Sequence, residues 1–127
     1  MFVAMAEPSL PATLRIRLIL APGVMLGPGK ADLLEGIRDT GSIAAAGRRM
    51  GMSYKRAWTL VGWLNAAFRE PLVQATRGGR GHGGAQLTTL GAEVLDAYRA
   101  IVERAAAATS TETETLCAHL LDRRDGK

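Results

Sequence analysis

The residues best suited to binding chemistry are the basic side chains between Arg48 and Arg80. This stretch holds seven arginine and lysine residues and one acidic residue, Glu70, so it carries a net charge of +6, whereas the whole 127-residue chain carries +4. The isoelectric point of the chain is about 9.8. Because the positive charge is gathered in one part of the chain, the composition indicates a polyanionic partner.

A first group of polar side chains lies in the segment from Ser53 to Thr59, which also contains Lys55 and Arg56. Lysine and arginine donate hydrogen bonds to guanine edges and to phosphates, and serine and threonine donate to phosphates. At the start of a helix, free backbone amides and the helix dipole attract the same anionic groups. An ordinary solvated helix face would carry similar residues, so the neighbouring elements must decide between the two interpretations.

The second group is a loop over residues 77–84 with five glycines, two arginines and one histidine. Three of its glycines match the pattern G-x-G-x-x-G, namely Gly79, Gly81 and Gly84. A dinucleotide site needs this pattern between a strand and a helix of a βαβ unit, whereas here the flanking segments, residues 72–76 and 85–87, are typical of a hairpin. We interpret the loop as a wing whose Arg77 and Arg80 contact phosphates or the minor groove. A solvated loop is the alternative.

A helix-turn-helix is predicted around the first group. Apolar residues at spacings of three and four predict helices over about residues 30–40, 43–50 and 54–68. Ser42 and Ser53 occupy N-cap positions of the second and third helices, which a two-residue turn joins. Such a pair places its second helix, here residues 53–68 with the cap, in the major groove. Arg48 and Arg49 end the second helix, where they suit the helix dipole or contact phosphate.

The helical wheel of residues 54–68 separates an apolar face from a basic one. The apolar face consists of Ala57, Leu60, Val61, Leu64 and Phe68. The opposite face consists of Lys55, Arg56, Thr59 and Trp63. An exposed tryptophan such as Trp63 usually marks a contact with a domain, a subunit or DNA. Tyr54 and Trp58 lie at the edge of the apolar face, which favours a place in the core over base stacking.

The remaining elements are predicted from alternating and helical patterns. An alternating pattern predicts a strand over residues 13–21, whose buried face is formed by Leu14, Ile16, Leu18 and Leu20. Residues 24–26 are a candidate second strand. A further helix is predicted over about residues 88–108, with Thr88 or Thr89 as its cap. Its apolar residues recur at spacings of three and four, and they are Leu90, Val94, Ala97, Tyr98, Ile101 and Ala105. Little of the same domain is left to cover this helix, so we expect a homodimer.

These elements together predict a fold class that is mostly α with a small β wing, a winged helix-turn-helix with a long C-terminal dimerisation helix. The length of the chain suits one domain. We expect a flexible leader at residues 1–12, the DNA-binding domain with its dimerisation helix at residues 13–108, and a polar, partly helical tail at residues 109–127.

The sequence contains no pattern typical of a metal site, an enzyme or a membrane protein. The soft metal ligands His82, Cys117 and His119 are divided between a loop and the tail, so no metal site is predicted, and a single cysteine excludes an internal disulfide. No nucleophile stands beside a base, so we predict no catalytic residues, no enzyme activity and no cofactor. Apolar runs stay shorter than the ~20 residues of a membrane span, and no signal peptide is recognised. A cytoplasmic protein without membrane contact is expected.

Several segments resemble the N-terminal winged helix domain of the ModE family of molybdate-responsive transcriptional regulators. They are GKADLLEGIRDTGSIAAAGRRMGMSYKRAWTLVGWLN, PLV, GGRGHGGAQLT and LGAEVLDAYRAI, and the resemblance covers about residues 13–103. It implies a dimer on a palindromic operator, near genes for molybdate uptake or molybdenum enzymes. It also implies a DNA-binding set formed by Ser53, Tyr54, Lys55 and Arg56 at the start of the recognition helix and Arg77 and Arg80 on the wing.

The family's molybdate-binding half consists of small β domains, and nothing after Ala108 has the pattern of a β barrel. We therefore expect a regulator without its own molybdate sensor. Two other interpretations stay open at the level of sequence. One is a protein-interaction module that dimerises with a full-length regulator through Trp63, and the other is a small oxyanion-binding protein.

Overall fold

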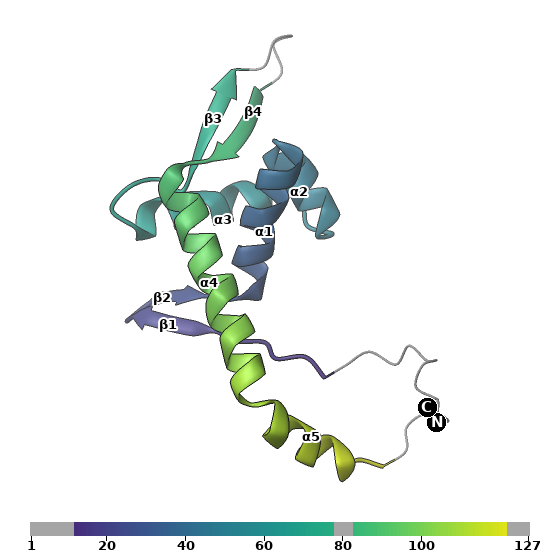
Figure 1. Cartoon of the computed structure of the whole chain (residues 1–127). Helices are drawn as coiled ribbons and strands as arrows, with labels where there is room; N and C mark the ends of the chain where they lie inside the picture. The colour runs from purple at the N-terminus through teal and green to yellow at the C-terminus, as the bar shows by residue number, and fades with distance from the viewer. Residues whose placement is uncertain (1–11, 78–82, 122–127) are drawn as a thin grey trace.

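The computed structural model describes residues 12–77 and 83–121 (Figure 1), and its first four helices contribute to one apolar core. The predicted mixture of helices and short strands is confirmed. In chain order the elements are β1 (Leu18–Ala21), β2 (Val24–Leu26), α1 (Pro28–Thr40), α2 (Ile43–Arg49), α3 (Tyr54–Ala67), β3 (Val73–Arg77), β4 (Gly83–Leu87), α4 (Thr89–Ala108) and α5 (Ser110–Ala118). Among the described residues, no helix has both the length and the apolar character of a membrane-spanning segment.

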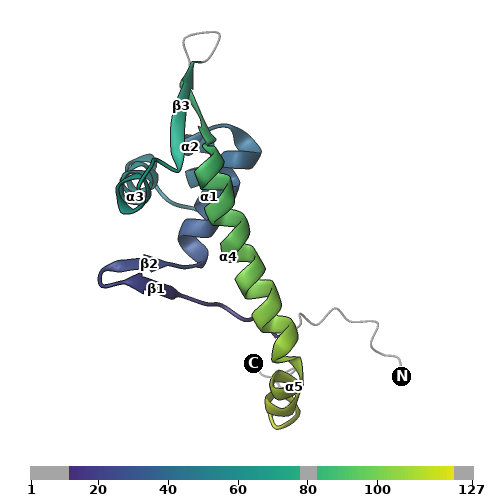
Figure 2. The ribbon, with the colours of Figure 1, turned by 60° about the vertical axis from the view of Figure 1, so that its left-hand side comes forward.

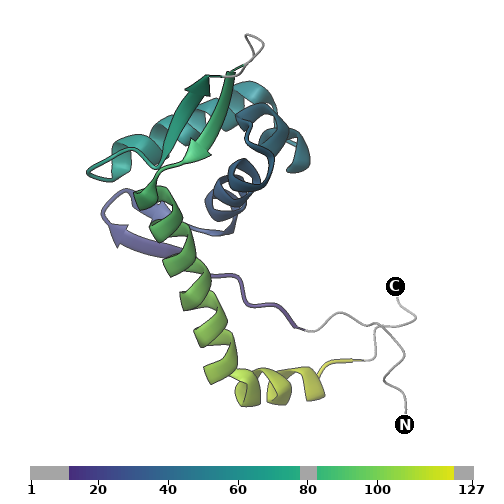
Figure 3. The same cartoon turned by 45° about the horizontal axis from the view of Figure 1, so that its top comes forward.

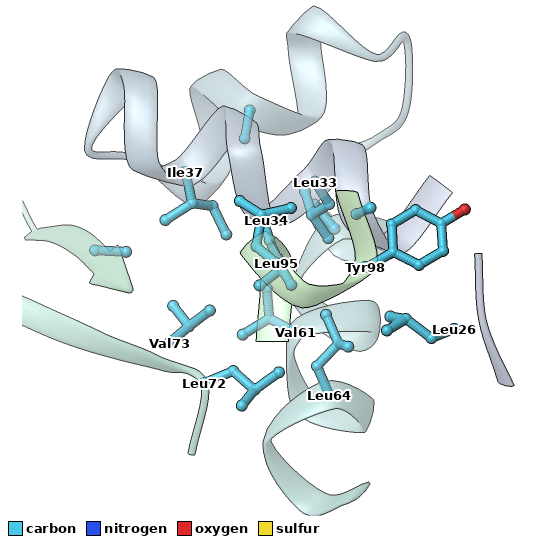
Figure 4. Close-up of a cluster of buried hydrophobic side chains, with 14 residues drawn as sticks. Leu26, Leu33, Leu34, Ile37, Val61, Leu64, Leu72, Val73, Leu95 and Tyr98 are labelled. Atoms are coloured by element: carbon cyan, nitrogen blue, oxygen red, sulfur yellow. The ribbon is translucent and has the colours of Figure 1, made fainter. Parts of the chain in front are cut away.

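The core forms where α1, α3 and α4 meet, and side chains from all three helices converge there (Figure 4). Leu33, Leu34 and Ile37 of α1 are fully buried, as are Leu64 of α3 and Leu95 of α4. Their spacing of three and four residues gives each helix one apolar face, and burying these faces together supplies the main stabilisation of the fold.

Helix α2 lies close to α1 because both helices carry small residues at the contact. A Cβ added to Gly36 would lie 2.9 Å from the Cβ of Ala46, so no larger side chain fits at Gly36 without a shift. The predicted caps are confirmed as well. The Ser42 hydroxyl accepts a hydrogen bond from the Ala45 amide at 3.0 Å, and the Ser53 hydroxyl accepts one from the Arg56 amide at 3.1 Å.

Strands β3 and β4 form an antiparallel hairpin that extends beyond the helices (Figures 1 and 3). The register pairs Val73 with Leu87 at the base and Arg77 with Gly83 at the outer end. The predicted hairpin is therefore confirmed, and the G-x-G-x-x-G pattern connects two antiparallel strands instead of a strand and a helix.

Helix α4 packs on the core with its first half and leads away from it with its second half (Figure 2). Thr88 is its cap, since the Thr88 hydroxyl accepts a hydrogen bond from the Gly91 amide at 2.9 Å. Tyr98 is buried, and its hydroxyl donates to the Ile16 carbonyl at 2.6 Å, which ties the segment before β1 to α4. Burial of the ring raises the pKa of the Tyr98 phenol, because the charged phenolate would be poorly solvated.

One expectation about the start of the domain needs correction. The first strand is shorter than predicted, because only residues 18–21 pair with β2, and the expected buried face is incomplete since Leu14 and Leu20 are exposed. An alternating pattern shows that one face is apolar, but not that another element covers it. In the predicted polar tail, residues 110–118 form α5, which has no buried residue.

Candidate nucleic-acid interface

The turn between α2 and α3 is compact and fixes the start of α3. Gly51 has a φ of 73°, a left-handed conformation that glycine adopts without strain. The Met52 amide then donates to the Gly47 carbonyl at 2.9 Å, which closes the turn onto the end of α2. The predicted helix-turn-helix is thus present, with the first turn of α3 at an exposed corner of the domain.

The outward face of α3 presents Lys55, Arg56 and Thr59, all of which are exposed as predicted. The Thr59 hydroxyl donates to the Lys55 carbonyl at 3.0 Å, so it is engaged by its own helix. The side chains of Lys55 and Arg56 form no ion pair with any other described residue. These two cations are therefore free to bind an external anion or a base edge.

Tyr54 and Trp58 are exposed, at 55% and 50% of their surface, so their expected place in the core was wrong. Their rings meet edge to face with centroids 6.3 Å apart, and the Trp58 indole donates a hydrogen bond to the Tyr54 hydroxyl. The pair lines a groove of about 360 Å³ between α3 and the β3–β4 hairpin, which we call the aromatic groove. The five residues of the predicted apolar face do contact the core, so the error concerns only the two aromatic residues at its edge.

Trp63 was predicted to point away from the core, and this prediction was wrong. Trp63 is half-buried and packs against the core, and the ammonium of Lys30 lies 4.1 Å from the centre of its ring. The same ammonium donates to the Met25 carbonyl at 3.1 Å. The junction between β2 and α1 therefore covers this side of α3, a long-range contact that a wheel of one helix cannot show.

Acidic side chains pair with three arginines, one each on α1, on α4 and at the end of α2. Arg38 pairs with Asp96 at 3.4 Å, Arg49 with Asp39 at 2.8 Å, and Arg99 with both Asp32 and Glu35. Arg48 forms no ion pair with another described residue, so the two arginines that end α2 differ in their surroundings. Lys55 and Arg56 at the start of α3 are therefore among the cations that no described carboxylate neutralises.

The wing is attached to the domain through Asn65, which sequence reasoning missed. The Asn65 side-chain oxygen accepts from the amides of Leu72 and Val73 at 2.9 and 3.0 Å, and its amide group donates to the Val73 carbonyl at 3.1 Å. On the other strand, the Ala85 amide donates to the Gly41 carbonyl at 2.9 Å. The signal in the sequence was one amide side chain among the small and apolar residues of the second half of α3.

The predicted wing residues lie at the edge of the described structure. Arg77 is the last residue of β3, at the end of the hairpin farthest from the core. Arg80 and His82 lie outside the described residues. Strands β3 and β4 extend beyond the helices, on the side of α3 that holds the aromatic groove.

Comparisons with known proteins agree with this geometry. No family model matches the chain. Molybdenum-pterin-binding protein MopA of Rhodobacter capsulatus is 43% identical over 94 residues, which cover 74% of this chain and 35% of MopA. Transcriptional regulator ModE of Yersinia pestis is 36% identical over 68% of this chain and 33% of that protein, and the dual regulator ModE of Escherichia coli K12 is 33% identical over the same shares. The chain spans about a third of the length of these relatives.

A solved structure supports the fold. The DNA-binding domain of CbnR, determined as a complex with DNA, superimposes with a TM-score of 0.54 over 69% of this chain and 95% of that chain, at 23% sequence identity. The element order, the closed turn before α3 and the β3–β4 hairpin are those of a winged helix-turn-helix. The chain therefore contains a winged helix-turn-helix domain that is similar in sequence to about a third of the length of the ModE and Mop proteins.

Proposed function

We propose that this protein is a sequence-specific DNA-binding transcriptional regulator that acts as a homodimer. In the proposal, α3 enters the major groove, and the wing at residues 77–84 contacts the DNA backbone or the minor groove. The observation that carries it is the pair of exposed cations, Lys55 and Arg56, in the first turn of the second helix of a helix-turn-helix. Neither cation has an ion-pair partner among the described residues, whereas Arg38, Arg49 and Arg99 all do.

The DNA-binding set of the proposal consists of Ser53, Tyr54, Lys55, Arg56 and Thr59 on α3 and Arg77 and Arg80 on the wing. The exposure of Tyr54 favours its inclusion, because the ring is available to a partner. The hydroxyl groups of Ser53 and Thr59 already form hydrogen bonds within α3. The Ser53 hydroxyl can still donate and the Thr59 hydroxyl can still accept, so each keeps one way to contact DNA, and the free amides at the start of α3 add donors for a phosphate.

The genes under control are proposed to belong to molybdenum metabolism. The support is the similarity to proteins whose names refer to molybdenum transport, molybdenum-pterin binding and ModE regulation. Sensing of molybdate by this chain is not part of the proposal. The alternative of an interaction module built around Trp63 loses its support, because Trp63 packs against the core.

The proposal is tested by selecting bound duplexes from a genomic library and measuring their affinity at a fixed salt concentration. Sequence-selective binding is expected, with selected duplexes bound well above random duplexes of equal length. Substitution Lys55→Ala should weaken binding to the selected duplex by ~1–3 kcal/mol and relax the preference at one base pair, if Lys55 reads a base edge.

The control for Lys55→Ala is Arg38→Ala, which removes one positive charge from a residue of α1 that is paired with Asp96 and lies outside the proposed DNA-binding set. This control should keep both the affinity and the base preference. Equal binding of the unaltered protein to selected and random duplexes would contradict the proposed function.

A further inference from the structure

A second group of cations surrounds a cavity of about 640 Å³ that the DNA-binding set does not account for. The cavity opens between the start of α3, the junction of β2 and α1, and the extended segment before β1. Its charged lining consists of Arg15, Arg17, Lys30 and Arg56, and no carboxylate lines it. We call it the cationic cavity.

The arginines of the cationic cavity are not neutralised within the described structure. Arg15, Arg17 and Arg56 form no ion pair with another described residue. Lys30 is held in place, because its ammonium donates to the Met25 carbonyl and lies over the Trp63 ring. Gathering four like charges around one opening is unfavourable unless an anion enters it.

Backbone groups favour an anion at the same place. Gly27 is the N-cap of α1 and supplies no side-chain cap, and Pro28 has no amide hydrogen. The amides of Gly29 and Lys30 belong to the first turn, where no acceptor exists within the helix. The positive end of the helix dipole lies there too. The stem of Arg17 passes over Gly27, since a Cβ added to Gly27 would lie 3.2 Å from the Arg17 Cγ.

The position of the cavity relative to α3 identifies the anion. The aromatic groove holds Tyr54 and Trp58 on the side of α3 that faces the hairpin, whereas Arg56 and Leu60 line the cationic cavity on the opposite side. Lys55 lies between these two sides on the exposed face. The major groove is bordered by a phosphate backbone on each side, so a helix within it has one backbone near each flank.

We propose that the cationic cavity binds a phosphate group of the DNA backbone on the flank of α3 opposite the wing. The wing and the cavity then hold the two backbones that border the groove, and α3 lies between them. This inference rests on the proposed function, because it assigns a second contact to the same DNA complex. It gives the segment before β1 a binding role through Arg15 and Arg17.

The test uses the full chain and the selected duplex, and measures affinity over a series of salt concentrations. Affinity falls as salt rises, and loss of one phosphate contact makes the slope of log affinity against log salt less steep by about 0.9. Arg17→Gln and Arg15→Gln are each expected to make this slope less steep by up to about 0.9, and to weaken selected and random duplexes alike. The matched control Arg38→Gln is expected to keep the slope of the unaltered protein.

A second measurement locates the contact. Replacing single backbone phosphates by neutral methylphosphonates should identify one position, on the flank away from the wing, where the unaltered protein loses affinity. Arg17→Gln should lose less affinity than the unaltered protein at that position and the ordinary amount elsewhere, since part of the contact is already absent.

Unchanged salt slopes in both Arg15→Gln and Arg17→Gln would overturn the inference, while selective binding by the unaltered protein would leave the proposed function standing. Inorganic phosphate, added at constant ionic strength, separates the two sources of the anion. If it raises the melting temperature of the unaltered protein, and Arg17→Gln removes that rise without weakening duplex binding, the cavity takes a free oxyanion and the assignment to DNA is wrong.

Discussion

Asn65 is the residue that joins the reading helix to the wing. Its side chain forms three hydrogen bonds to the backbone of Leu72 and Val73, at the start of β3. These backbone groups have no strand partner on that side, so without Asn65 two amides and one carbonyl would lose a partner in a half-buried place. One side chain therefore sets the position of the hairpin relative to α3.

Substitution Asn65→Ala should lower the free energy of unfolding by about 2 kcal/mol, because it leaves two backbone amides without an acceptor. Asn65→Asp keeps an acceptor for the two amides but replaces the donor to the Val73 carbonyl by an oxygen that repels it, so a loss of stability is expected here too. Urea unfolding measures both. The control Gln74→Ala, at an exposed position of β3, should change stability by no more than about 0.5 kcal/mol. A loss in Asn65→Ala no larger than in this control would contradict the assigned role.

At the scale of elements, the sequence predicted which segments are helices but not everything that surrounds them. Caps and spacing identified α3 and its buried residues Ala57, Val61 and Leu64, because these depend on the local chain alone. The places of Trp58 and Trp63 depend on the hairpin and on the β2–α1 junction, which reach α3 from distant parts of the chain. Local periodicity contains no information about these contacts.

The candidate site was also predictable only where its residues are close together in the sequence. The cations of α3 are adjacent in sequence and were found together, whereas Arg15 and Arg17 join Arg56 only through the fold. An extended segment with alternating residues was interpreted as a strand, and its arginines as the solvent face of that strand. Arg15 and Arg17 reach the same cavity as Arg56 because β2 and the start of α1 lie beside α3 in the fold.

The two tryptophans offer a test of which side of α3 approaches DNA. In Trp63→Phe the remaining indole is Trp58, which is exposed beside the aromatic groove, and in Trp58→Phe it is the half-buried Trp63. Titration with the selected duplex should change the fluorescence of Trp63→Phe more strongly, since binding alters the surroundings of an exposed indole. An equal fractional change in both variants would argue against this face of α3 as the DNA side.

At the scale of the whole molecule, α4 leaves the core and carries apolar surface away from it (Figure 2). Ile101 is 42% exposed, and Leu116 on α5 is more exposed still. Ile101 lies three residues beyond the buried Tyr98, near the point where the contacts of α4 with the core end, since Val102 still packs against the core. We propose that a second copy covers this surface, which would place two reading helices on one palindromic site.

Substitution Ile101→Glu tests the proposed dimer, because a carboxylate would have to be buried at the contact. A cost of about 3 kcal/mol corresponds to a roughly hundredfold higher dissociation constant, which sedimentation analysis over a range of concentrations resolves. The matched control Ile19→Glu places the same charge on β1, where the side chain is 75% exposed, and it should leave the association unchanged. If Ile19→Glu alone dissociated the protein, the contact would lie on the β1–β2 sheet. The two cationic cavities of the pair would then be close to the two-fold axis, because Arg15 and Arg17 lie just before β1.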